Sequence, residues 1–201
     1  PAGAMARHYR ARAFTLPSMP VSLVNPLSLR AFNTFYYHQQ WTRQTRQLQH
    51  YEPFFYPLDG LLEWNRMYGP HGFFQYQCAL PMAAGPDATA RLLEAIGGSG
   101  LGSFLAVLKL FGTHVSPGLL SFPLHGVTLA LDFPKRGETL HRLFEVLDGI
   151  VAEAGGRLYP AKDGRMPGAM FRADYPQWQA FSEWIDPQFS SSLWRRIMEA
   201  A

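Results

Sequence analysis

The 201-residue sequence has one cysteine, Cys78, and three lysines against fifteen arginines. A single cysteine excludes an internal disulfide and a cysteine-based zinc site, and it is consistent with a reducing compartment. The seven histidines lack the His-x-x-x-His and His-Glu-x-x-His spacings, so no metal site is expected. No apolar run has the length needed to span a bilayer, and no signal peptide is recognisable.

Charge of either sign is also scarce. Charged residues make up 16% of the chain and the formal net charge is +3, so the pI of 9.2 reflects a small arginine excess. The arginines are scattered, which argues against a nucleic-acid-binding protein. Hydrophobic residues reach 47% and aromatic residues 14%, a composition typical of a globular chain with a sizeable core.

The sequence divides into a connector and one larger domain. It starts PAGAMARHYR, without an initiator methionine at position 1, and we expect a piece of a longer protein. Residues 1–30 are rich in proline and arginine and predict an extended connector or a segment left over from cloning. The domain is expected over 31–201. Within it, residues 51–72 mix aromatic side chains with turn formers, which predicts a mobile lid or a membrane-facing loop.

Regular patterns begin after Gly72 and predict six elements in the order β-α-β-β-α-β. Alternation favours strands over 73–81, 103–112, 126–134 and 157–161, and apolar spacing favours helices over 85–98, with Asp87 as N-cap, and over 136–156. This order predicts an α+β fold of the ferredoxin-like kind, with an antiparallel sheet and both helices on one face. Two more helical segments follow, within 176–187 and 189–200.

Polar residues at strand spacing suggest a functional sheet face. Gln75 and Gln77 lie two apart on the first strand and therefore share a face, and Lys109 interrupts the second strand. Thr128 lies on the third strand, followed at spacings of two by Ala130 and Asp132. If Lys162 lies on the same face, amides and ammonium groups could meet hydroxyls and developing negative charge. The alternatives are a solvated outer face, and a loop lysine paired with Asp163.

Other motifs give no catalytic set. The glycine-rich stretch 97–103 follows a helix and precedes a strand, the wrong order for a phosphate-binding loop. The sequence also has no Gly-x-Ser-x-Gly elbow. From these motifs the chain shows no self-sufficient catalytic set.

Four strings carry a family resemblance: PLDGLLEWNRMYGPHGFFQYQCALP, SFLAVLKLFG, LLSFPLHGVTLALDFP and GGRLYPAKDGRM. In order, over roughly residues 30–198, they resemble the C-terminal substrate domain, or cap domain, of FAD-linked oxidases of the vanillyl-alcohol oxidase and aldonolactone oxidase family. The resemblance is strongest to members that act on a polyprenylphosphoryl ribose in making a cell-wall precursor. It implies an FAD-dependent oxidoreductase that converts a sugar CH–OH group to a keto group by hydride transfer, in the cytoplasm.

The resemblance also implies roles for individual residues. Lys162, in the AKD motif, would lie at the flavin edge, contact substrate and stabilise the reduced flavin. The remaining implied substrate-binding residues are Gln75, Gln77, Lys109, Phe111, Thr128 and Phe55. The implied partners are the FAD-binding domain of the same protein, which this chain lacks and without which no activity is expected, and a sugar or polyprenylphosphoryl-sugar substrate. A reductase or epimerase partner and peripheral membrane contact are left open.

Departures from the family pattern keep alternatives open. Aldonolactone and alditol oxidases carry Glu-x-Arg on the first strand, where this chain has Gln75 and Gln77, so a cap domain of that class is disfavoured. The ribose-oxidising members have Asn and Cys where this chain has Thr128 and Ala130, which leaves the sugar open. A third reading is a ferredoxin-like binding module without catalysis.

Overall fold

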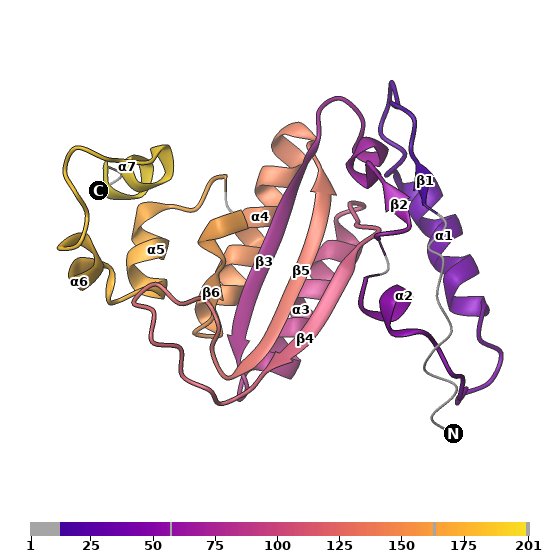
Figure 1. Ribbon diagram of the computed structural model, residues 1–201, viewed down its shortest axis with the longest axis horizontal. Coiled ribbons are helices and arrows are strands. Elements are labelled where there is room, and N and C mark those ends of the chain that lie inside the picture. The colour runs from indigo at the N-terminus through magenta and orange to yellow at the C-terminus, as the bar shows by residue number, and fades with distance from the viewer. Residues whose placement is uncertain (1–12, 57, 163, 200–201) are drawn as a thin grey trace. The chain divides into compact units, whose positions relative to one another are not determined.

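A computed structural model describes residues 13–56, 58–162 and 164–199. These residues form two compact units, one ending at Gly72 and one beginning at Phe73 (Figure 1). Among the described residues, no helix combines the length and the apolar character needed to cross a membrane. The predicted lid, residues 51–72, lies in the first unit, and its Phe54 and Phe55 side chains are exposed; its role stays a prediction.

The first unit is built of short elements. Strand β1 (Phe14–Thr15) pairs in parallel with β2 (Leu61–Leu62), and the helices are α1 (Pro26–His38), α2 (Tyr51–Phe55) and the 3-10 helix η2 (Trp64–Tyr68). Helix α1 begins inside the segment predicted as a connector. The Asn25 side chain caps it by accepting hydrogen bonds from the Leu27 and Ser28 amides, and the Asn25 amide donates to the Ser28 hydroxyl.

The second unit contains a four-stranded sheet. Its strands are β3 (Phe73–Pro81), β4 (Ala106–Phe111), β5 (Gly126–Pro134) and β6 (Arg157–Leu158), in the spatial order β4-β5-β3-β6 with every neighbour antiparallel. Helix α3 (Gly85–Gly98) follows β3 and helix α4 (Gly137–Glu153) follows β5. The two helices pack against each other and cover one face of the sheet (Figure 1). The predicted mixed fold with an antiparallel sheet is confirmed.

The strand register separates two faces of this sheet. Residues directly opposite in an antiparallel pair point to the same side. Tyr76, Cys78 and Leu80 of β3 are buried with Leu129, Leu131 and Phe133 of β5 in the core under α3 and α4. The alternate residues point away from the helices and form what we term the open face: Gln75, Gln77, Ala79, Val107, Lys109, Phe111, Thr128, Ala130, Asp132 and Arg157.

Several predicted boundaries were wrong, including the end of the helix expected over 136–156, which stops at Glu153. The fourth strand ends at Leu158, because Pro160 cannot donate a ladder hydrogen bond and the chain turns into the 3-10 helix η3 (Pro160–Lys162). Strand β4 starts at Ala106, because the Ser103 hydroxyl bonds the Leu105 amide and carbonyl in a local turn. Ala84, and not Asp87, is the N-cap of α3. Asp87 lies in the first turn, where its charge favours the helix dipole.

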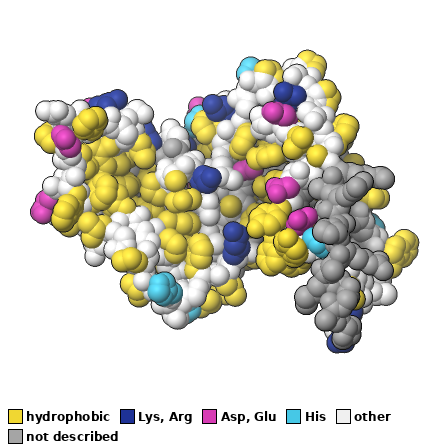
Figure 2. Space-filling model, in the orientation of Figure 1, with side chains coloured by type: hydrophobic (Ala, Val, Ile, Leu, Met, Phe, Trp, Pro, Cys, Tyr) yellow, Lys and Arg dark blue, Asp and Glu magenta, His cyan; other side chains and the backbone are white. Residues whose placement is uncertain are grey.

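Three short helices complete the second unit: α5 (Gly168–Asp174), α6 (Trp178–Ser182) and α7 (Ser192–Glu199). The last two were predicted and α5 was not. Helix α5 is fastened to β6, because Asp174 Oδ2 accepts from the Leu158 amide at 3.0 Å and the Tyr175 hydroxyl donates to the Leu158 carbonyl at 2.6 Å. Hydrophobic side chains gather on the surface over these helices (Figure 2); Trp184 and Phe189 are among the exposed ones.

The Asp174 carboxyl predicts a pH dependence of stability. Burial raises its pKa from 3.8 to about 6, partly offset by the Leu158 amide and by Arg157. The folded chain therefore holds this proton more tightly than the unfolded chain. Its contribution to the free energy of unfolding falls as pH rises from about 4 to about 6, by on the order of 2 kcal/mol. Asp174→Asn keeps an acceptor for Leu158 and should flatten this slope in urea titrations.

The matched control for this measurement is Asp87→Asn, which changes an exposed carboxylate in the first turn of α3. It should leave the slope between these pH values close to that of the unmodified chain. An Asp174→Asn variant whose stability still falls over this range would contradict the assignment.

The register predicts which thiols can react. Burial raises the pKa of the Cys78 thiol to about 12, so we expect the native chain to resist a disulfide reagent such as dithionitrobenzoate. Ala130 is partly exposed on the open face and Leu129 is buried in the core. Ala130→Cys should add a thiol that reacts at least about tenfold faster than that of Leu129→Cys, its matched control. Equal rates would mean that the register is wrong.

Candidate functional site

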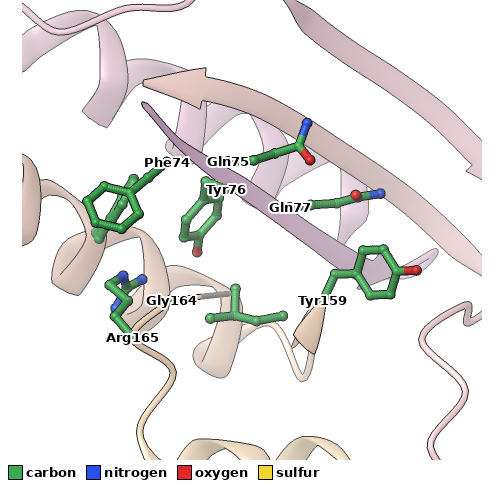
Figure 3. Close-up of a pocket in the computed structure, with 9 residues that line it drawn as sticks. Phe74, Gln75, Tyr76, Gln77, Tyr159, Gly164 and Arg165 are labelled. Carbon is green, nitrogen blue, oxygen red and sulfur yellow. The ribbon is translucent and has the colours of Figure 1, made fainter. Parts of the chain in front are cut away.

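The open face brings together five of the predicted site residues. Gln75 and Gln77 come from β3, Lys109 and Phe111 from β4, and Thr128 from β5. The pairing register places all five on the same side of the sheet. In Figure 3 the two glutamines project from one side of β3, and Phe74 and Tyr76 project from the other. Strand periodicity placed Gln75, Gln77, Lys109 and Thr128 in this set, and the family resemblance added Phe111.

The residues of the open face form successive rows across the strands. Gln75 faces Asp132 in the first row, and Gln77 lies opposite Ala130 in the next. Thr128 lies in a third row beside Lys109. Residues two apart along a strand are separated by about 6.5 to 7 Å, so the rows extend over a length suited to a small polar molecule.

The strand spacing placed Asp132 on this face, but it was not among the predicted substrate-binding residues. It is 0% exposed, and neither carboxylate oxygen has a hydrogen-bond partner of good geometry among the described residues. Burial raises the pKa of its carboxyl; the Gln75 amide and the positive charge of Lys162 lie near enough to lower it in part. A buried carboxylate with unmet acceptors is costly in a structural role and common where a protein binds something.

Lys162 ends the 3-10 helix η3, and its amide donates to the Tyr159 carbonyl at 3.2 Å. Its side chain is exposed. Its charge acts on the carboxyl of Asp132, an open-face residue. The alternative partner, Asp163, lies outside the described residues.

The segment after Lys162 is anchored by Arg165. Its two terminal nitrogens each lie 2.7 Å from an oxygen of Asp148 on α4, and the guanidinium stacks over the Phe144 ring at 4.7 Å. The Tyr76 hydroxyl donates to the same Asp148 at 3.2 Å. A bidentate, half-buried pair of this kind fixes geometry well. Arg165 therefore fixes the chain three residues after Lys162.

An aromatic cluster closes one end of the open face. Phe122, from the loop between β4 and β5, stacks on Tyr159 at 4.4 Å and meets the Phe111 ring edge-on at 5.9 Å. The Tyr159 amide donates to the Gln77 carbonyl at 2.9 Å, which extends the β6 pairing by one residue. Phe122 and Tyr159 were not predicted, because their positions depend on a long loop and on a strand end.

Described residues of the second unit line a small hollow and a larger one. The small one, of about 20 Å³, lies at the edge of β3 beside Gly164 and Arg165 and has room for one water-sized group (Figure 3). The larger one, of about 400 Å³, is lined by the loop 113–125 together with Arg157 and Tyr175. Phe55 belongs to the first unit, where its ring is 67% exposed. Among the described residues, no group of three His, Cys, Asp or Glu side chains could hold a metal ion.

Comparison with known proteins identifies larger relatives. No protein-family model matches the chain. Over 189 residues, 91% of its length, the chain is 38% identical to decaprenylphosphoryl-beta-D-ribose oxidase of Mycolicibacterium smegmatis. Over 131 residues, 63% of its length, it is 37% identical to an uncharacterized protein in the mprA 5' region of Streptomyces coelicolor. The chain spans 40% and 35% of these two relatives. The resemblance predicted from the sequence is confirmed: the chain matches one portion of a larger oxidase.

Proposed function

We propose that this chain is the substrate-binding domain of an FAD-dependent oxidoreductase that oxidises a sugar CH–OH group, in a lipid-linked ribose, to a keto group. The observation that carries the proposal is the similarity, over 91% of the chain, to a protein named decaprenylphosphoryl-beta-D-ribose oxidase. The fold supports it, since the β-α-β-β-α-β order with strands arranged β4-β5-β3-β6 fits the ferredoxin-like class that we assign.

The open face supplies groups suited to a sugar. Gln75 and Gln77 carry amides that can bind hydroxyl groups, and the rings of Phe111 and Tyr159 offer apolar contact. The buried Thr128 hydroxyl contacts the Gln77 amide from β5. Lys109 adds positive charge near the Thr128 row. A lysine ammonium can bind a phosphate group as a point charge through charge-assisted hydrogen bonds.

The residues of this chain fit one side of a flavin. The exposed Lys162 ammonium and the buried, unmatched Asp132 carboxylate place a cation and an anion at one end of the open face. FAD, when bound by the rest of the protein, would accept the hydride from the carbinol carbon. Lys162 would stabilise the negative charge that develops during this transfer, and a compact ammonium suits that position better than a broad guanidinium.

The proposal extends to partners. The remainder of the longer protein would provide the FAD-binding domain, and a reductase or epimerase would supply or consume the sugar. The exposed aromatic residues of 51–72, among them Phe54 and Phe55, would contact the polyprenyl chain or a membrane surface.

Substitution of Lys162 tests the catalytic assignment. In the intact flavoprotein, Lys162→Ala should lower the rate of anaerobic flavin reduction by roughly two orders of magnitude, since one stabiliser of transition-state charge is lost. Stopped-flow absorbance would measure this. Lys135→Ala is the matched control, because Lys135 lies over the Phe74 ring at 4.8 Å and not on the open face. Thermal unfolding of both variants should be nearly unchanged. Reduction by Lys162→Ala within a few-fold of the unmodified enzyme would refute the role.

The absence of a phosphate-binding loop from the described residues predicts weak FAD binding by the 201-residue chain alone. Fluorescence titration should find no submicromolar affinity. The longer protein should purify yellow and bleach anaerobically with a polyprenylphosphoryl ribose. Bleaching with an alditol or an aldonolactone instead would favour the alternative oxidase class, and a colourless protein would favour a binding module.

A further inference from the structure

Each of the two glutamines on the open face lies next to a β5 side chain that can only accept a hydrogen bond from it. Thr128 is 2% exposed, and its hydroxyl donates to the Cys78 carbonyl at 2.8 Å. A hydroxyl has a single proton, so its oxygen can then only accept from other groups. Gln77 Nε2 lies 3.5 Å from that oxygen. Only the NH₂ end of the Gln77 amide satisfies this contact, and its carbonyl end is therefore turned away from β5.

Asp132 orients the Gln75 amide in the same way, with its NH₂ end toward β5. The two residues are direct partners in the β3–β5 register. An ionised carboxylate has acceptors only, and both oxygens of this one lack a well-formed hydrogen bond among the described residues. Burial raises the pKa of the Asp132 carboxyl, and the Gln75 amide and the positive charge of Lys162 offset part of this effect because both favour the ionised form. A Gln75 carbonyl facing this carboxylate would be repelled, so the NH₂ end faces Asp132.

We propose that Thr128 and Asp132 are positioning residues that fix the amide orientation of Gln77 and Gln75, so that the open face presents two carbonyl oxygens to its ligand. The ligand must then offer two hydroxyl donors. This inference rests on the proposed function for the identity of the substrate as a sugar, and adds a rule of recognition: the site selects groups that donate. An ether or a keto group of the same size, at either position, is rejected because it only accepts.

The first experiment needs no cofactor and uses the 201-residue chain with ¹⁵N-labelled glutamine. Solvent exchange of the Gln77 side-chain NH₂ should be at least about tenfold slower than that of an exposed glutamine, because these protons face a buried hydroxyl. Thr128→Val keeps the shape and should abolish the difference, whereas Thr128→Ser keeps the hydroxyl and should preserve it. Gln75 should respond to neither. An exchange rate at Gln77 that ignores Thr128→Val would overturn the proposal.

The second experiment tests recognition in the intact flavoprotein. Sugar substrates methylated at one hydroxyl at a time would be compared with the parent compound through kcat/KM for flavin reduction. Two of the methyl ethers should react at least about a hundredfold more slowly. Asp132→Asn offers Gln75 both a donor and an acceptor, so its amide can turn, and discrimination against one ether should fall by about tenfold or more. Thr128→Val should relax discrimination at a different hydroxyl.

Thr128→Ser is the control that should retain the selectivity of the unmodified enzyme. Loss of packing alone would lower kcat/KM for every substrate and leave the ratio of kcat/KM between the parent sugar and each methyl ether unchanged. Unchanged ratios in both Asp132→Asn and Thr128→Val would refute the inference. If the sugar fails to reduce the flavin while the Gln77 exchange pattern holds, the proposed substrate is wrong and the amide orientation stands.

Discussion

The nine-residue antiparallel pairing of β3 with β5 is the constraint on which the second unit depends. Side chains alternate between the two faces of a strand, so a shift by one residue would exchange the faces completely. The shift would bring Cys78 and Leu80 out of the core and place Gln75 and Gln77 beneath the helices. Gly126 helps to hold the register, because a Cβ at this position would overlap the Leu80 carbonyl. The same alternation thus builds the core and the open face.

Strong periodicity made the central elements predictable. The bounds of β3, α3 and β5 agree with those expected from the sequence, because each has a clear apolar alternation or stripe along its whole length. The short elements are determined by tertiary contacts more than by local periodicity. Strand β6 was predicted, but it has only two residues, too few for alternation to fix its end. Helix α5 has seven residues and starts directly after Pro167, so it shows no period long enough to recognise. Tertiary contacts, such as those of Asp174 with β6, create these elements.

The site was predictable to the same extent. Gln75, Gln77 and Lys109 could be placed on one face because period and polarity agree within each strand. Asp132 stands out only when its complete burial is known, and burial depends on segments that lie far away in the sequence. The Ser103 hydroxyl, for example, accepts from the Asp132 amide across 29 positions. The aromatic cluster of Phe122 needed the path of a fourteen-residue loop, 112–125, which no local pattern specifies.

Strand β4 lies at the edge of the described sheet, and its helix-side residues Leu108 and Leu110 are 58% and 71% exposed. An apolar edge strand with unpaired backbone N–H and C=O groups can pair with a strand of another molecule and so extend the sheet. Lys109 lies between the two leucines, and its charge hinders this pairing of β4 with another chain. A neutral substitution at Lys109 would therefore promote aggregation as well as alter the open face. Poor recovery of such a variant reports on colloidal behaviour, and only kinetics of the remaining soluble fraction reports on binding.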